Sequence, residues 1–171
     1  MKKKIAIVLP YKEIYSQSYA GAASIWLKDY IEKSKLSKET LIYGNLDSSL
    51  KPITKNFKNI KIPYTNFSKT KQYINFFYKD YLKNKYQIVE IHNRPEYLNF
   101  LINKKIDAKL IFFFHNNPQD IRGSKTVGER LKILDNTEKV FFVSSWTKNK
   151  FFEGLPFSTK SNCEILYPSI N

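Results

Sequence analysis

Short apolar runs alternate with longer amphipathic segments along this chain. The runs are rich in Ile, Val and Phe and end at Pro, Gly or polar residues, which predicts buried strands at 4–9, 40–43, 60–62, 87–91, 109–114, 139–143 and 163–167. Between them, helical spacing of apolar residues predicts helices at about 22–34, 68–84, 95–104, 126–135 and 145–152. This alternation indicates an α/β domain with a parallel sheet covered by helices on both faces.

Several residues mark where these helices begin. Ser68 is a predicted cap, and Pro95 suits the first turn of its helix. Thr126 is followed three residues later by Glu129, the spacing of a capping box. The polar and basic residues 45–58 are predicted to be a loop. In the long aromatic helix, the predicted inner face consists of Tyr73, Phe76, Phe77, Tyr81 and Leu82.

The two histidines of the chain occupy equivalent places, since each closes an apolar run and precedes Asn. His92 is followed by Asn93 and Arg94, and His115 by Asn116 and Asn117. Ligands of open α/β sheets gather beyond the carboxyl ends of the strands, so both segments are expected at a site. Histidine titrates near neutral pH and serves as acid, base or hydroxyl-orienting group. The alternative is that each ring only satisfies neighbouring backbone groups.

Other strand ends and loops supply further candidates, each with a structural alternative. Gly21 stands at the start of a helix, where backbone N–H groups can bind a phosphate. The structural alternative is that this small residue only permits tight packing of the helix against a strand. Arg122 and Gly123 stand in a polar loop, where the guanidinium is an anion clamp or a surface salt bridge. Ser144 is a site residue or a helix cap. The aromatic residues 73–81 are core or, alternatively, a nucleic-acid stacking surface.

Several classes of protein are disfavoured because their motifs are absent. The sequence has no GxGxxG fingerprint, no GxxxxGK[ST] loop, no HExxH and no GxSxG. Dinucleotide-dependent dehydrogenases, P-loop NTPases and α/β-hydrolases are therefore not expected, and no metal is predicted. The single cysteine, Cys163, excludes an internal disulfide and fits a cytoplasmic location. The apolar run at residues 5–9 is too short for a signal peptide.

The composition adds a strong positive charge. The 171 residues include 29 Lys+Arg and 15 Asp+Glu, a formal net charge of +14. This surplus favours anionic partners such as an acidic membrane leaflet, a phosphorylated substrate or nucleic acid. Alternatively, the lysines reflect an A·T-rich genome and no function at all.

Taken in order, five segments resemble the N-terminal domain of a GT-B glycosyltransferase, with the closest likeness to the retaining glycosyltransferase 4 group. Residues 20–27 (AGAASIWL) resemble the small-residue loop and first helix, and residues 89–95 (VEIHNRP) and 112–116 (FFFHN) resemble two strand-end motifs. Residues 140–148 (VFFVSSWTK) resemble a strand–Ser–helix block, and residues 165–171 (ILYPSIN) an interdomain connector. Each motif is loose, but their order and spacing span nearly the whole chain.

The resemblance implies a Rossmann-like acceptor-binding domain at residues 1–164, with the start of the connector at 165–171. The C-terminal donor-binding domain is expected to lie outside this chain, which alone should lack efficient activity. The implied enzyme moves a sugar, with retention, from a nucleotide-sugar to a glycan, lipid or cell-envelope acceptor. The nucleotide-sugar is a co-substrate, and no metal or other cofactor is implied.

The resemblance also assigns roles to individual residues. His115 matches a position that contacts the transferred sugar or acceptor and is the predicted catalytic residue. Gly21 and Ala22 match the loop near the donor diphosphate. The acceptor side of the cleft is predicted to use His92, Asn93, Arg94, Asn116, Asn117, Arg122, Gly123 and Ser144.

Two other functions remain open at this point. A non-enzymatic basic module would bind nucleic acid or an anionic polymer, and its affinity would fall with salt. A regulatory subunit would pair with a separate donor-binding chain. The preferred interpretation is the glycosyltransferase domain, cytoplasmic and with peripheral contact with an anionic membrane as a further hypothesis.

Overall fold

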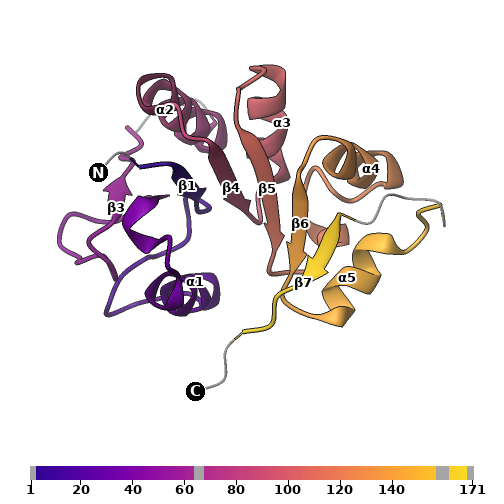
Figure 1. The fold of residues 1–171 in the computed structure, drawn as a ribbon, viewed down its shortest axis with the longest axis horizontal. Coiled ribbons are helices and arrows are strands. Elements are labelled where there is room, and N and C mark those ends of the chain that lie inside the picture. Colours follow the sequence, from indigo (N-terminus) through magenta and orange to yellow (C-terminus); the bar gives the residue numbers. More distant parts are fainter. Residues whose placement is uncertain (1–2, 64–67, 157–161, 169–171) are drawn as a thin grey trace.

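The structure is a computed structural model that describes residues 3–63, 68–156 and 162–168. In this part of the chain, seven parallel strands form one sheet in the order β3-β2-β1-β4-β5-β6-β7 (Figure 1). The strands are β1 (Ile5–Val8), β2 (Thr40–Gly44), β3 (Phe57–Asn59), β4 (Ile88–His92), β5 (Lys109–Phe114), β6 (Lys139–Phe142) and β7 (Cys163–Ile165). The predicted Rossmann-like α/β fold is confirmed.

Five α-helices and two short 3₁₀ turns connect the strands within the described residues. The helices are α1 (Ala22–Lys33), α2 (Lys69–Asn84), α3 (Pro95–Asn103), α4 (Val127–Asp135) and α5 (Ser145–Phe152), and the 3₁₀ turns are η1 (Ser37–Glu39) and η2 (Pro118–Asp120). None of the helices in the described ranges is both long and apolar enough to cross a membrane.

The strand order reverses next to β1, which pairs with β2 on one side and β4 on the other. From β1 the chain runs outward through β2 to β3, then returns to β4 and continues outward to β7. Connections that leave a central strand in opposite directions open a crevice beyond its carboxyl end. The carboxyl ends of β1, β4 and β5 are therefore the expected place for a site.

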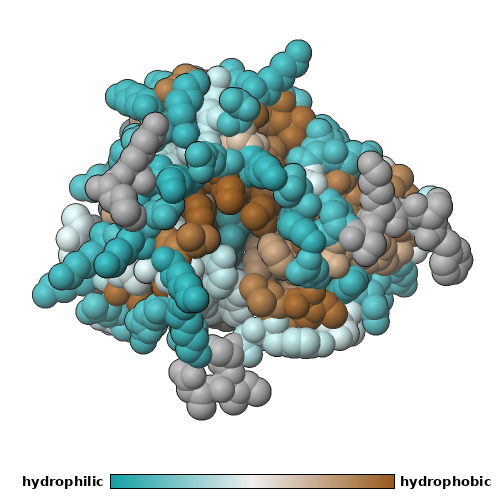
Figure 2. Space-filling model, in the orientation of Figure 1, coloured by the Kyte–Doolittle hydropathy of each residue, from teal (hydrophilic) through white to brown (hydrophobic). Residues whose placement is uncertain are grey.

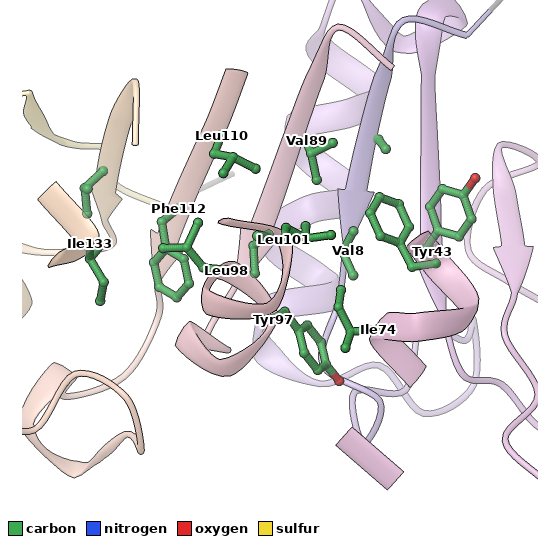
Figure 3. Close-up of a cluster of buried hydrophobic side chains, with 14 of the residues drawn as sticks. Val8, Tyr43, Ile74, Val89, Tyr97, Leu98, Leu101, Leu110, Phe112 and Ile133 are labelled. Carbon is green, nitrogen blue, oxygen red and sulfur yellow. The ribbon is translucent and has the colours of Figure 1, made fainter. Parts of the chain in front are cut away.

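The helices divide unequally between the two faces of the sheet. One face packs against α2, α3, α4 and α5, and its core includes Val8, Val89, Phe112, Leu98 and Ile133 (Figure 3). The other face packs against α1, through a smaller core of Ile7, Leu9, Tyr15, Trp26, Leu27, Ile31, Ile42 and Phe113. Residues on the α1 face of β4 and β5 consequently lie under one helix only.

The end of β5 is anchored by aromatic packing on the opposite face. Phe114 stacks on Phe142 of β6, with ring centroids 5.6 Å apart, and both contact Phe151 of α5. All three rings are fully buried, and each contributes about 1.5–3 kcal/mol through apolar burial. This packing holds the strand end from which His115 emerges.

The predicted helix boundaries are confirmed to within one or two residues. Thr126 and Glu129 form the predicted capping box, with each side chain accepting from the other's backbone N–H. Ser68 and Ser144 both cap their helices, and Pro95 occupies the first turn of α3.

Three details of the prediction are wrong. The edge strand is Phe57–Asn59 rather than 60–62, so it includes the last two residues of the predicted loop 45–58. Phe57 pairs with Ile42, whereas Ile60 adds only one hydrogen bond, to Gly44. Strand β7 ends at Ile165, two residues before the predicted end. In α2, Ile74 is buried while Phe76 and Leu82 are 40% and 45% exposed, because the helix turns its Tyr73–Phe77–Tyr81 row inward.

Candidate functional site

A buried carboxylate and a buried imidazole lie on the α1 face of β4. Side chains two residues apart point to the same face of a strand, so Glu90 and His92 are neighbours. Glu90 is 5% exposed and His92 is fully buried. A buried carboxylate is costly unless it is hydrogen-bonded, and His92 supplies that partner.

Hydrogen bonds link these two residues to the second histidine. Glu90 Oε1 lies 2.6 Å from His92 Nε2, and His92 Nδ1 lies 2.8 Å from His115 Nε2. The two histidines predicted from their equivalent strand ends therefore contact each other directly. We refer to Glu90, His92 and His115 as the relay.

The turn after β4 fixes the position of His115. Asn93 adopts a left-handed conformation with φ of 49°, which Asn tolerates better than most residues. Its N–H donates to the Phe113 carbonyl, and its Oδ1 accepts from the N–H of His115 at 2.8 Å. One side chain thus joins the ends of β4 and β5.

Aromatic rings enclose the two imidazoles. Phe113 stacks against His92 and His115, with centroid distances of 5.3 and 4.6 Å. Trp26 of α1 packs on Phe113 and meets the edge of His115 at 5.5 Å. This apolar cover excludes water from the hydrogen bonds of the relay and strengthens them.

His115 is uncharged at neutral pH. Burial, followed by the charge of neighbouring His92, lowers the pKa of His115 to about 2. A neutral imidazole has one donor nitrogen and one acceptor nitrogen, so it orients a hydroxyl without attracting anions.

His115 also lines a pocket at the carboxyl edge of the sheet. The pocket has a volume of about 540 Å³, and α1, the strand-end loops and Pro168 form its walls. Its lining consists of Glu13, Ala22, Ala23, Ile25, Trp26, Asp29, Asn93, His115, Asn116, Val143 and Pro168. Figure 2 shows the surface in the orientation of Figure 1, with hydrophobic residues on the walls of a central hollow ringed by hydrophilic ones.

Four of the predicted site residues reach this lining, namely Ala22, Asn93, His115 and Asn116. His92 does not reach it, because it lies fully buried behind His115. Its place in the structure is that of a support for His115 and not of a cleft wall.

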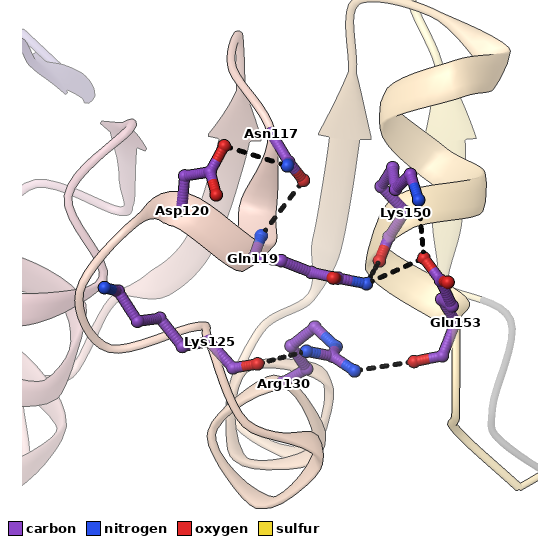
Figure 4. A network of polar contacts seen from close by, with 7 residues as sticks. All are labelled: Asn117, Gln119, Asp120, Lys125, Arg130, Lys150 and Glu153. Carbon is purple, nitrogen blue, oxygen red and sulfur yellow. Dashed lines mark hydrogen bonds and ion pairs between the residues drawn. The ribbon is translucent and has the colours of Figure 1, made fainter.

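Four other residues that were predicted to bind the acceptor, Asn117, Arg122, Gly123 and Ser144, make contacts within the fold. Asn117 accepts from Gln119 N and donates to Asp120, and Gln119 bonds to α5 (Figure 4). Arg122 is 86% exposed and lies 3.5 Å from Glu96. Gly123 has φ of 91° and is buried against Pro95, and Ser144 caps α5. Their predicted role in acceptor binding remains a prediction.

Arg94 is a predicted site residue that has a buried polar atom, Nε, without a hydrogen-bond partner among the described residues. Burial raises the pKa of Tyr97, and the positive charge of nearby Arg94 offsets part of that rise. Arg94 therefore lies on the α3 side of the strand end, and it does not line the 540 Å³ pocket.

The helix N-terminus that was predicted to face a diphosphate holds a carboxylate of the chain itself. Glu13 Oε1 accepts from Ser24 N at 3.0 Å and from Ser24 Oγ at 2.7 Å. A negative charge is favourable at this end of a helix. A Cβ on Gly21 would collide with the Glu13 carboxylate, so glycine at this position makes room for that contact.

Sequence reasoning missed three residues of the site: Glu13, Trp26 and Glu90. Glu90 carried a signal, since it is the one charged residue in the apolar run of β4 and lies two positions before His92. Trp26 was indistinguishable from any core aromatic on a helix. The Glu13–Ser24 contact depends on how the loop after β1 folds back, which no local pattern reveals.

Elsewhere in the described part of the chain, a larger hollow of about 650 Å³ lies at the amino edge of the sheet, between Gln87 and Glu138. It contains no histidine and lies at the opposite end of the strands from the relay. Among the described residues, no three His, Cys, Asp or Glu side chains gather in a way that could hold a metal.

Comparison with solved structures identifies the architecture. Sucrose-phosphate synthase from Thermosynechococcus elongatus superposes on 96% of this chain with a TM-score of 0.64 and 10% identity, and the match covers 48% of that protein. HepE from Anabaena, solved in complex with UDP and glucose, superposes on 99% of the chain with a TM-score of 0.64 and 12% identity, covering 45% of HepE.

The chain has the fold of a GT-B glycosyltransferase domain. It spans about half the length of these two glycosyltransferases. At such low identity the likeness concerns the fold alone. No family model and no curated protein matches the sequence.

The low pKa of His115 predicts how stability depends on pH. The unfolded chain gains a proton at this residue below about pH 6.5, whereas the folded chain does not. The free energy of unfolding should therefore fall on acidification, by about 1–2 kcal/mol from pH 6.5 to 5 for this group. Urea denaturation should show a shallower pH dependence for His115→Asn. Parallel curves for the two proteins would contradict the assignment.

The contact at Gly21 predicts a second stability effect. Gly21→Ala should displace Glu13 from Ser24 and lower the free energy of unfolding by about 1–2 kcal/mol, the value of the lost hydrogen bonds. The matched control is Gly128→Ala in α4, whose Cβ meets nothing within 4 Å and should stabilise the helix. In a Glu13→Ala background the Gly21→Ala penalty should largely vanish, and a full penalty there would refute this explanation.

Proposed function

We propose that this chain is the acceptor-side domain of a GT-B glycosyltransferase, which moves a sugar from a nucleotide-sugar to a glycan, lipid or cell-envelope acceptor. The observation that carries the proposal is the pocket at the carboxyl edge of the sheet, where the neutral His115 joins polar and aromatic neighbours. The GT-B fold supports the same reaction class.

The chemistry of the pocket suits a neutral, hydroxyl-rich ligand. Its polar groups are the amides of Asn93 and Asn116, the carboxylates of Glu13 and Asp29, and the imidazole of His115. Amides, carboxylates and imidazole all form hydrogen bonds with sugar hydroxyls. Trp26 adds an apolar surface of the kind found in small-molecule sites.

The same pocket is poorly suited to a diphosphate. Among the described residues, no lysine or arginine lines it, and Glu13 places a negative charge at the N-terminus of α1. The donor diphosphate is therefore proposed to be held mainly by a second, donor-binding domain, as in a complete two-domain enzyme. HepE was solved with UDP and glucose, which supports a nucleotide-sugar as the donor class. Membership of glycosyltransferase family 4 and retention of configuration are proposed from the sequence motifs.

The positive charge of the chain is proposed to serve a surface other than the pocket. The net charge is +14, whereas the charged residues of the pocket lining are acidic. Lysines outside the pocket would attract the enzyme to an anionic membrane leaflet, where a lipid-linked acceptor resides.

Sugar transfer by the full-length gene product tests the proposal. A panel of UDP-, GDP-, ADP- and TDP-sugars should include at least one donor. His115→Asn should lower kcat/KM about 10²–10⁴-fold, the usual contribution of a positioned acid–base group. Glu138→Gln, at the opposite edge of the sheet, should retain full activity. Unchanged turnover in His115→Asn would remove His115 from the reaction, and no transfer from any donor would overturn the proposed function.

Vesicle sedimentation tests the membrane hypothesis separately. The protein should pellet with vesicles that contain anionic lipid and remain in the supernatant with neutral vesicles. Raising the salt from about 0.1 M to 1 M should release it, since screening shortens the range of surface charge. Equal sedimentation with both lipids would show that the charge plays no part in membrane contact.

A further inference from the structure

A continuous line of hydrogen bonds runs from the buried carboxylate to the pocket. Both ring nitrogens of His92 are engaged, Nε2 by Glu90 at 2.6 Å and Nδ1 by His115 Nε2 at 2.8 Å. Among the described residues, Nδ1 of His115 has no hydrogen-bond partner, and of the three relay residues only His115 lines the pocket. Nδ1 of His115 is therefore the end of the line that a ligand can reach.

This line permits two arrangements that differ by one proton. In the first, His92 Nε2–H donates to Glu90, His115 Nε2–H donates to His92 Nδ1, and His115 Nδ1 presents a lone pair. In the second, His92 is an imidazolium that donates to both neighbours, and His115 Nδ1 carries a hydrogen. His115 is neutral in both arrangements, but its free nitrogen changes from acceptor to donor.

We propose that Glu90, His92 and His115 form a proton relay, in which Glu90 keeps the added positive charge on His92 while His115 exchanges the proton with the ligand. Glu90 and His92 are thus positioning residues, and His115 is the catalytic residue. The role of the exchanged proton rests on the proposed sugar transfer.

The proton balance of the step is simple. When an acceptor hydroxyl attacks the sugar, its O–H bond breaks and an Nδ1–H bond forms on His115. The Nε2–H bond of His115 breaks, and an Nδ1–H bond forms on His92. The electron pair of the hydroxyl forms the new glycosidic bond on the same face from which the diphosphate departs with the pair of the broken bond, as retention of configuration requires. The added positive charge is then on His92, next to the Glu90 carboxylate.

The surroundings favour the charge on His92. Glu90 is an opposite charge in direct contact with His92, and such a partner stabilises an imidazolium. No carboxylate of the described residues is bonded to His115, and burial together with His92 lowers its pKa to about 2. On α1, Trp26 is apolar, and Tyr30 stays neutral because burial and Glu90 raise its pKa to about 12. Glu13 and Asp29 are the other acids at the pocket lining that His115 shares.

Ring ¹⁵N NMR of the protein without any ligand tests the relay independently of sugar transfer. As the pH is lowered, His92 should move to imidazolium shifts. Over the same range, His115 should exchange its Nε2–H form for the Nδ1–H form without becoming an imidazolium. Imidazolium shifts at His115 in the first titration step would overturn the proposal.

Glu90→Gln supplies the matching variant, because its amide oxygen can still accept from His92 Nε2–H but carries no charge. The titration midpoint of the relay should fall by about one pH unit or more, a tenfold or greater loss of proton affinity. Glu96→Gln, which removes a carboxylate that pairs with Arg122 on the outside, should leave the midpoint unchanged. An unchanged midpoint in Glu90→Gln would overturn the role of Glu90, and the wild-type titration decides the proposal even if that variant does not fold.

Discussion

The hydrogen bond between Glu90 and His92 is the contact on which the rest of the site depends. A carboxylate buried in a sheet needs a partner, and the residue two positions along the same strand supplies it. With one nitrogen of His92 committed to Glu90, the other is aimed at His115. Trp26 closes this face of the sheet over the imidazoles and keeps water from competing for the hydrogen bonds.

The fold places this contact where it can act. Parallel strands bring the ends of β4 and β5 to the same edge, and the reversal of strand order next to β1 opens a crevice there. Asn93 joins the two strand ends through its backbone and side chain. The aromatic packing of Phe114 on the far face prevents the end of β5 from shifting. A neutral His115 is thereby presented to a pocket of amides, carboxylates and one indole ring.

Much of this arrangement could be predicted from the sequence, because it depends on local patterns. Apolar runs ending in Pro or Gly indicate the strands, and the Thr126–Glu129 spacing indicates its helix cap. The edge strand at Phe57 was missed because a strand of three largely exposed residues shows little alternation of apolar and polar positions. The histidines were found from their strand ends, but their mutual contact and the support of Glu90 depend on register between strands. The Glu13–Ser24 contact depends on a loop and had no sequence signature.

The central claim is that His115, backed by His92 and Glu90, faces the hydroxyl of a bound sugar. A crystal structure of the protein with the donor and acceptor that support transfer tests this most directly. The account predicts a sugar hydroxyl within about 3 Å of His115 Nδ1, the usual hydrogen-bond distance, in the pocket between α1 and the ends of β4 and β5. A sugar bound instead in the hollow at the amino edge of the sheet, with His115 out of reach, would contradict it.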